Sequence, residues 1–567
     1  MTGSNSQSKS AIALAGLCAA AALSSVIYIF LEHRPNGHPK VVYLTLLHLT
    51  VLPALIFYWH VSKQTGDSRF RLSPALGAAA GILFAIAALW VSASIDHGRV
   101  VADETAYSFQ ARIFAAGKLK AEAMPGALPN PAAAPVEIYF ENTIQTPEGW
   151  YAKYPPGWPL ILAVGEWLRF PWIVNPIFGV LQLLVIWRMA GRWSSNAGVL
   201  SVLVAATSPY MVIDNAGYLS HGSEALFALL ALMFVMDGAR RRRLPPIVFS
   251  FGFVFISILV RPFTGAVVAL LCTSIVILEL HRYRRILLQA LAVIALAGLA
   301  SVAATLIVNE VFTGHPLLSP YALARGGTKV QELIMDPSEI VRNILSFWRW
   351  SVTGTVLTMW PFILLFAAYG CWRENMNRGE LFYLASLFPL LIGANFFYNY
   401  GHLGASGSFI GERYYYEGFC PLAIAAGRGL DLLITRWRIR PIPVAAGLAV
   451  LLGLQFLMLD RGWREVADVI QPYNDAYSLA VGSPPKPLVF IGGTTLYFMS
   501  KHVNWNLVAW RRAPVVFLND PGPTGREAAA CLFGRPDYRV VWWDTTQLRL
   551  LKVDGRASCG QQAAAYH

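Results

Sequence analysis

Residues 74–119 read PALGAAAGILFAIAALWVSASIDHGRVVADETAYSFQARIFAAGKL. The run at 74–95 is predominantly apolar, and about 20 such residues in a helix cross the hydrocarbon core of a bilayer. Asp103 and Glu104 follow just beyond that run, at the start of a segment whose apolar residues have helical spacing. The stretch therefore predicts a membrane-spanning helix followed by an acid pair at the membrane surface.

Twelve further apolar runs continue this pattern along the 567 residues. The chain is 56% hydrophobic and only 14% charged, whereas a soluble domain averages about 25% charged residues. The first run follows Lys9 and lacks a small-residue cleavage site, so we expect it to be an uncleaved span rather than a signal peptide. The sequence predicts a polytopic α-helical membrane protein of about 13 transmembrane helices, at residues 11–31, 41–60, 74–95, 172–190, 197–213, 219–237, 246–260, 263–280, 286–308, 353–371, 381–397, 417–434 and 441–459.

The loop charges predict the orientation of these helices. Every second loop is basic, and Lys and Arg concentrate in cytoplasmic loops. The N-terminus is therefore expected in the cytoplasm and the C-terminal tail outside it. A run at 157–170, only about 14 residues long, is expected to be an interfacial or re-entrant helix on the outer side. The basic loops carry Lys63, Arg69 and Arg71; Arg188 and Arg192; residues 240–243; Arg282, Arg284 and Arg285; Arg373 and Arg378; and Arg436, Arg438 and Arg440.

The same distribution accounts for the net charge of +13, because these basic residues set topology and contact anionic lipid. Membrane lipids are thus expected partners, and a nucleic acid is not.

Four regions follow from these assignments. Residues 1–96 hold N-terminal transmembrane helices, residues 97–170 a large outer loop with interfacial helices, and residues 171–459 the transmembrane core. Residues 460–567 are less hydrophobic and contain strand-like runs at 487–492, 513–518 and 538–543, with candidate helices near 495–511 and 524–533. That alternation predicts a small extracytoplasmic α/β domain. Cys531 and Cys559 lie in it, and their spacing leaves open whether they form a disulfide.

Asp103 and Glu104 have two readings. One carboxylate could act as a general base that removes a proton from an acceptor hydroxyl or amine. Alternatively, both acids could stabilise a helix N-terminus, where the helix dipole favours negative charge. Spacing alone does not separate the two.

Cationic residues predicted on the same outer side provide partners for an anion. Lys153 precedes a stiff Pro-Pro turn at 155–156, next to Tyr154, and an ammonium held there suits a lipid-linked phosphate, although it could equally be an ordinary headgroup contact. Arg413 could clamp a phosphate bidentately or form an ion pair with a neighbouring acid.

Two further residues near the outer ends of spans are candidates for the same site. His221 begins the 219–237 run and could line a polar cavity or be a hydrogen-bonded packing residue. Arg261 separates two apolar runs on the side where topology gives it no role, so it could bind an anion or pair with Glu224.

These motifs, in this order, resemble the GT-C superfamily of glycosyltransferases. The matching segments are DETAYSFQARIFAAGKL, KYPPGWPLILAVGEWL, LSHGSEAL, VRPFTG and ERYYYEGFCPLAIAAGRGL, within residues 103–433. The branch they are most similar to contains bacterial relatives of protein O-mannosyltransferases and the lipid A aminoarabinose transferase. The resemblance implies a polyprenyl-phosphate sugar donor, an extracytoplasmic active site and inversion at the anomeric carbon.

The resemblance also assigns roles to residues. It makes Asp103 the candidate base and Glu104 its partner, which orients the acceptor or Asp103. It places Lys153 and Arg413 near the donor phosphate, with Tyr154, His221 and Arg261 as extrapolations. These assignments concern residues 103–104, 153–154, 221, 261 and 413. The sequence departs from the family pattern in two places.

The departures concern the position of the acid pair and the lysine motif. The acid pair follows the third span instead of the first, so the first two spans are expected to be additions to the core. The lysine segment reads KYPPGW instead of Lys-Pro-Pro, which weakens an assignment to the donor or acceptor of the aminoarabinose branch.

The resulting hypothesis is an inverting membrane glycosyltransferase of the bacterial inner membrane, monomeric, with a glycolipid, polysaccharide or protein acceptor. No cofactor is expected besides the lipid donor, and no metal, because no ligand cluster has metal spacing. The alternatives are a transporter or flippase for a lipid-linked glycan, a ligase or polymerase that uses a lipid diphosphate, and a non-enzymatic assembly or sensor protein. A transporter is expected to place polar residues near the bilayer midplane, whereas the charges here lie at the outer ends of the runs.

Overall fold

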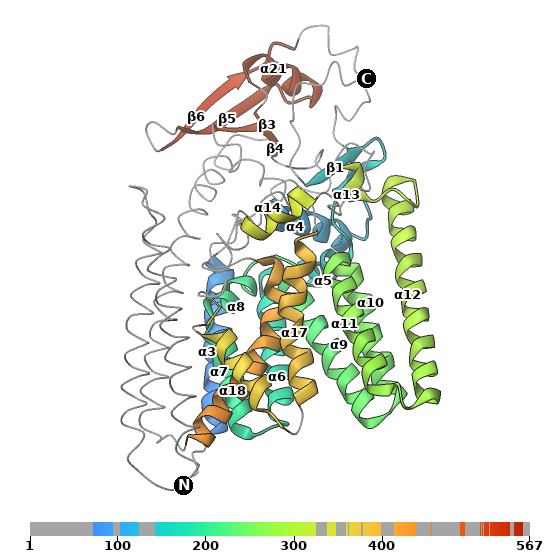
Figure 1. Cartoon of the computed structure of the whole chain (residues 1–567). Helices are drawn as coiled ribbons and strands as arrows, with labels where there is room; N and C mark the ends of the chain where they lie inside the picture. Colours follow the sequence, from blue (N-terminus) through green and yellow to red (C-terminus); the bar gives the residue numbers. More distant parts are fainter. Residues whose placement is uncertain are drawn as a thin grey trace, which may run out of the picture.

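A computed structural model provides the fold (Figure 1). It describes residues 72–94, 102–123, 142–324, 337–346, 359–360, 362–375, 378–397, 413–437, 455, 488–493, 511, 513, 515–520, 522–544 and 549–559. The predicted spans at 11–31, 41–60 and 441–459 therefore lie essentially outside the described residues.

A bundle of apolar helices makes up most of this region. Its long members are α3 (Pro74–Ser94), η1 and α6 (Pro171–Ile173 and Val174–Ala190), α9 (His221–Arg241), α11 (Pro262–Leu280), α12 (Arg284–Thr313), and η3 with α18 (Arg413–Gly418 and Phe419–Arg436). In the described ranges these six stretches are long and apolar enough to cross a membrane. Shorter apolar helices accompany them: α7 (Ser195–Ala206), α10 (Leu244–Val260), α16 (Ile363–Arg373) and α17 (Arg378–Asn395). The chain is accordingly a multi-pass membrane protein.

One predicted span is wrong in its extent. The run at 197–213 is two helices, because α7 ends at Ala206 and α8 (Pro209–Asp214) begins after a break. Pro209 starts α8, and the residue before it, Ser208, has an extended backbone with φ −73° and ψ 121°. Proline lacks an N–H and disfavours a helical conformation in the residue that precedes it, so the sequence contained the signal for this break.

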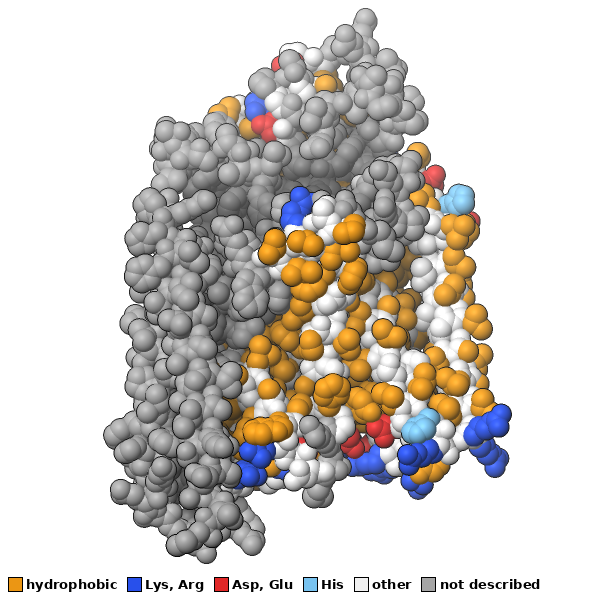
Figure 2. All heavy atoms as spheres, viewed as in Figure 1, with side chains coloured by type: hydrophobic (Ala, Val, Ile, Leu, Met, Phe, Trp, Pro, Cys, Tyr) orange, Lys and Arg blue, Asp and Glu red, His pale blue; other side chains and the backbone are white. Residues whose placement is uncertain are grey.

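The bundle is held together by close helix contacts at small residues. A Cβ on Gly427 of α18 would lie 2.5 Å from the backbone nitrogen of Ser201 in α7. Small residues let helix backbones approach in membranes, where lipid tails supply no hydrophobic drive for association. Figure 2 shows hydrophobic side chains over the outward faces of the helices and Lys and Arg side chains gathered at one end. The loops at 240–243 and 282–285 supply basic residues.

The opposite end of the bundle carries short elements. These are α4 (Ala102–Ala115), the hairpin β1 (Thr143–Thr146) and β2 (Gly149–Ala152), α5 (Gly157–Trp167), α13 (Pro320–Leu323) and α14 (Pro337–Ser346) (Figure 1). Helix α5 has 11 residues, about 16 Å of rise, which is too short to cross the hydrocarbon core. This agrees with the expectation that the run at 157–170 does not span.

Helix α12 is the longest helix in the described ranges. Its 30 residues give a length of about 45 Å, and few of its side chains are buried. Near its end, Phe312 packs on Tyr151 of the hairpin, with ring centroids 5.2 Å apart.

The C-terminal region forms a four-stranded sheet in the order β4-β3-β5-β6. Strands β3 (Leu488–Gly493), β4 (Val516–Asn519) and β5 (Asp537–Asp544) coincide with the three strand-like runs, and β6 (Arg549–Arg556) was not anticipated. Strand β3 pairs parallel with β4 and β5, while β6 is antiparallel to β5, and α21 (Pro523–Leu532) connects β4 to β5. The 460–567 boundary stays a prediction, because residues 460–487 are outside the described ranges.

Cys531 and Cys559 form a disulfide, with their Cα atoms 5.4 Å apart, which settles the question that their spacing left open. The bond joins the end of α21 to the segment that follows β6. The sheet belongs to the same buried cluster as Phe109 and Ile113 of α4 and Trp150 of β2.

Candidate active site

Helix α4 brings the acid pair to the end of the bundle, but it points the two acids in different directions. Successive residues of an α-helix are rotated by about 100°. Asp103 is a quarter exposed, whereas Glu104 is almost completely buried. Each acid therefore has a separate set of contacts.

Asp103 faces three hydrogen-bond donors from distant parts of the chain. Its Oδ1 accepts from the Tyr154 hydroxyl at 2.7 Å and from Asn142 Nδ2 at 3.0 Å. Its Oδ2 accepts from an Arg413 guanidinium nitrogen at 2.8 Å. Burial alone would raise the pKa of Asp103, but Arg413 in first place, then the Tyr154 hydrogen bond and the charge of Lys153, outweigh it and hold the pKa below its usual value. Asp103 is thus a carboxylate at neutral pH.

Glu104 has a structural contact. Its Oε1 accepts from the backbone N–H of Tyr218 at 2.7 Å. A Cβ on Gly217 would lie 2.3 Å from that oxygen, so any other residue there would require the carboxylate to shift. The structure thus places Glu104 against the segment before α9.

Lys153 and Tyr154 are placed by the hairpin that precedes α5. The Lys153 ammonium lies 4.7 Å from the ring centroid of Tyr321 and 5.4 Å from that of Tyr154. The Tyr154 ring also stacks at a tilt on Tyr107 of α4, with centroids 4.6 Å apart. Burial, followed by the charge of Asp103, raises the pKa of Tyr154 well above its usual value. Tyr154 therefore stays a neutral donor to Asp103.

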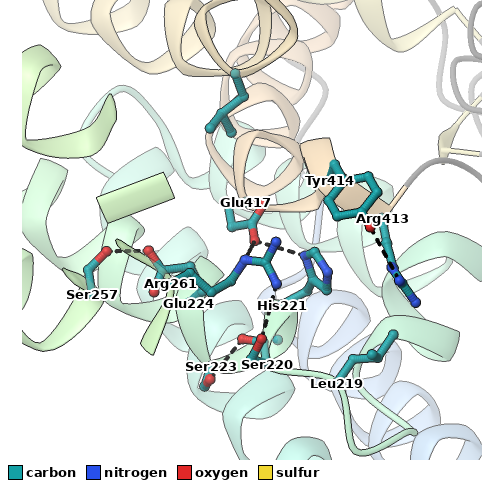
Figure 3. A network of polar contacts seen from close by, with 12 residues as sticks. Leu219, Ser220, His221, Ser223, Glu224, Ser257, Arg261, Arg413, Tyr414 and Glu417 are labelled. Atoms are coloured by element: carbon teal, nitrogen blue, oxygen red, sulfur yellow. Dashed lines mark hydrogen bonds and ion pairs between the residues drawn. The ribbon is translucent and has the colours of Figure 1, made fainter. Parts of the chain in front are cut away.

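Arg261 lies at the junction of α10 and α11 and is held from two sides (Figure 3). Its Nε is 3.4 Å from Glu417 Oε1, and one terminal nitrogen donates to Ser220 Oγ at 3.2 Å. Ser220 Oγ also lies 3.2 Å from the Tyr107 hydroxyl, which links Arg261 to α4. The same Glu417 oxygen lies 2.9 Å from His221 Nδ1.

His221 is therefore one step removed from the predicted phosphate site. Its side chain is almost completely buried and makes a polar contact with Glu417. It supports the residue that holds Arg261. The prediction that Arg261 pairs with an acid is confirmed, with Glu417 as the acid that faces it, while Glu224 accepts a hydrogen bond from Ser257 (Figure 3).

Arg413 is buried and still has hydrogen-bonding capacity. One terminal nitrogen contacts Asp103 Oδ2 and, at 3.4 Å, the Tyr414 hydroxyl. Its Nε and other terminal nitrogen have no hydrogen-bond partner among the residues that the structure describes. Leaving a buried donor unsatisfied costs about 1–3 kcal/mol, so an anion with two oxygens would be favoured beside this guanidinium.

The structure thus brings together the predicted residues Asp103, Lys153, Tyr154, Arg261 and Arg413, which we call the acid–base cluster. Sequence reasoning missed Asn142, Tyr107 and Ser220. Within the described ranges, no three His, Cys, Asp or Glu residues are grouped to hold a metal ion.

Comparisons with known proteins concern the fold. No protein-family model and no characterised protein sequence matches the chain. The chain is similar to the crystal structure of ArnT from Cupriavidus metallidurans bound to undecaprenyl phosphate, with a TM-score of 0.50 and 15% identity over 85% of this chain and 99% of that one. The chain therefore has the fold of ArnT, in agreement with the resemblance found in the sequence.

Two larger mycobacterial proteins are also similar, each at 15% identity. They are the arabinosyltransferase EmbB from Mycobacterium smegmatis (TM-score 0.35, 75% of this chain and 44% of that one) and the arabinofuranosyltransferase AftD from Mycobacteria (TM-score 0.44, 83% and 35%). The chain spans less than half the length of either.

Proposed function

We propose that this chain is an inverting glycosyltransferase that moves a sugar from a polyprenyl-phosphate donor to an extracytoplasmic acceptor. The observation that carries the proposal is the acid–base cluster. An ionised carboxylate and three cationic side chains, from four separate segments, converge at the end of the bundle opposite the basic loops. Such a cluster suits a reaction that needs both a base and a counter-charge for a departing phosphate.

The roles follow from the contacts. Asp103 removes the proton from the acceptor as its oxygen or nitrogen attacks the anomeric carbon. The bond from that carbon to the phosphate oxygen breaks, and the electron pair leaves on the phosphate. Arg413 uses for the phosphate the two nitrogens that have no hydrogen-bond partner among the described residues, while Lys153 and Arg261 add positive charge around it. The charges of these groups would stabilise the leaving phosphate without a metal ion.

The donor class rests on a further point. ArnT, which shares the fold, was crystallised with undecaprenyl phosphate. A polyprenyl monophosphate carrying a sugar is therefore the first donor to test, and a lipid diphosphate is the alternative. An inner-membrane location with a cytoplasmic N-terminus and an outer acid–base cluster agrees with the gathering of Lys and Arg at the other end (Figure 2).

The test compares two neighbouring acids. Purified full-length protein in lipid nanodiscs is given radiolabelled polyprenyl monophosphate or diphosphate sugars with an extracted envelope fraction as acceptor. Asp103→Asn is expected to lower the transfer rate by about 10²- to 10⁴-fold, the usual contribution of a general base. Glu104→Gln is the matched control, because its amide oxygen can still accept from the Tyr218 N–H.

Three results would contradict the proposal. Wild-type turnover by Asp103→Asn would show that Asp103 is not the general base. Transfer from the diphosphate alone would favour a ligase or polymerase. Movement of intact lipid-linked sugar across the bilayer without transfer would favour a flippase.

A further inference from the structure

We propose that Asn142 is a positioning residue for Asp103, which holds Oδ1 of the carboxylate so that Oδ2 is the oxygen that takes the acceptor proton. This inference rests on the proposed function and adds to it a residue and an atom. Asn142 lies directly before strand β1, and its side chain is buried.

The geometry distinguishes the two carboxylate oxygens. Oδ1 receives two neutral donors, the Tyr154 hydroxyl at 2.7 Å and Asn142 Nδ2 at 3.0 Å. A carboxylate accepts only, so the amide nitrogen of Asn142 must be the atom that faces it. A carboxylate oxygen has about two lone-pair sites, so Oδ1 is fully occupied. Among the residues that the structure describes, Oδ2 receives one donor, from Arg413, and keeps room for a proton.

The backbone of Asn142 ties the carboxylate to the neighbouring cation. Its carbonyl oxygen accepts from the backbone N–H of Lys153 at 3.1 Å, next to the first pair of the hairpin, Thr143 with Ala152. Its φ is 66°, in the left-handed region that asparagine tolerates better than most side chains. One residue therefore sets the position of Lys153 through its backbone and that of Asp103 through its side chain.

The proposal separates a fixed contact from an exchangeable one. Asn142 and Tyr154 are neutral and have no attraction for a phosphate group beyond a hydrogen bond, so they stay on Oδ1 throughout the reaction. Arg413 is charged and has two unpartnered nitrogens among the described residues, so a bound phosphate can draw it away from Oδ2. The proton of the acceptor then moves to Oδ2, and the electron pair of the acceptor atom forms the new bond to the anomeric carbon.

Two substitutions separate the side chain from the backbone. Asn142→Gly keeps a backbone that adopts φ 66° without strain and removes only the amide donor. We expect kcat to fall roughly ten- to a hundredfold, the range for losing a hydrogen bond to a charged group, while KM for the lipid donor stays near the wild-type value. Asn142→Asp places a second carboxylate against Oδ1 and is expected to move the acidic limb of the pH–rate profile to higher pH.

That pH shift has a defined set of competing charges. The titratable and charged groups around the Asp103 carboxylate are Tyr107 on its own helix, Lys153 and Tyr154 after β2, Arg261 between α10 and α11, and Arg413 in η3. Both substitutions leave all of them in place. A displaced acidic limb in Asn142→Asp therefore reports the local carboxylate pair.

Arg169→Gly is the matched control, because Arg169 also has a positive φ of 67° and lies at the end of α5. The control is expected to keep wild-type kinetics. The inference is overturned if Asn142→Gly keeps the wild-type kcat, or if Asn142→Asp loses activity only in proportion to loss of folded protein, with an unmoved acidic limb. The proposed function fails separately, if the wild-type protein itself transfers no sugar.

Discussion

Replacing Arg413 with glutamine tests the ion pair at the centre of the acid–base cluster. The substitution removes the cation 2.8 Å from Asp103 Oδ2. Two charges about 4 Å apart at an effective dielectric constant of about 20 attract by about 4 kcal/mol. Because the Asp103 side chain is 25% exposed, solvent screening reduces this attraction, and we expect about 1–2 kcal/mol. Arg413 is the largest of the influences that lower the pKa of Asp103, so the pKa should rise in the variant.

The sign of the pH effect follows directly. A general base works only when it is deprotonated, so a higher pKa moves the acidic limb of the kcat/KM profile to higher pH. Above that limb a second loss remains, because the leaving phosphate has lost a cation. One such contact contributes about 3 kcal/mol, or roughly 10²-fold in rate. The assay is initial-rate transfer in nanodiscs across a pH series, with lipid donor and acceptor varied separately.

Two companion variants make the result specific. Arg413→Lys keeps the charge without the planar fork, so it should restore the wild-type acidic limb and still bind the donor weakly. Arg428→Gln removes a partly buried arginine that pairs with Glu374 and Asp431 far along α18, and it should leave the limb in place. An unmoved acidic limb in Arg413→Gln, with measurable activity, would refute the assignment of this ion pair to the base.

Two stability predictions concern other contacts. Gly217→Ala should displace Glu104 from its backbone donor and lower the free energy of unfolding by about 1–3 kcal/mol. The measurement is the thermal midpoint of unfolding, which should fall. An unchanged midpoint would show that the carboxylate can relocate at no cost. Replacing Cys531 and Cys559 with serine opens a loop with a sequence separation of 28, for which chain entropy gives about 3–4 kcal/mol. The paired variant should therefore be cleaved faster by protease in the sheet region, and equal cleavage rates under oxidising conditions would contradict this.

Much of the fold could be predicted because membrane spans and sheet strands have strong sequence patterns. The apolar runs gave α3, α6, α9 and α11 nearly at their observed ends, and three strand-like runs gave β3, β4 and β5. The cluster of Asp103 with Lys153, Arg261 and Arg413 could be predicted from loop order and resemblance. These residues are up to 310 positions apart, so no local pattern showed their contacts.

The missed features depend on side-chain direction and on single backbone positions. Asp103 and Glu104 are adjacent and chemically alike. The orientation of α4 alone decides that Asp103 forms an ion pair with Arg413 and that Glu104 accepts from a backbone N–H. His221 was predicted either to line a polar cavity or to be a hydrogen-bonded packing residue, and its partner Glu417, 196 residues later, could not be identified from local sequence. Asn142 lacked any motif, because its placement depends on a single left-handed backbone position directly before β1.

The length of α12 has a consequence for how this protein responds to its membrane. The apolar run of this helix at 286–308 is about 35 Å long, somewhat more than the roughly 30 Å hydrocarbon core, and beyond that run Phe312 packs on Tyr151 of the hairpin that precedes Lys153. A long helix adapts to bilayer thickness by tilting. A change in this tilt would shift Phe312 against the hairpin, so we expect the thickness of the surrounding lipid to affect the position of Lys153 relative to Asp103. The lipid composition of the bilayer is in this sense a physical variable of the reaction, alongside donor and acceptor concentration.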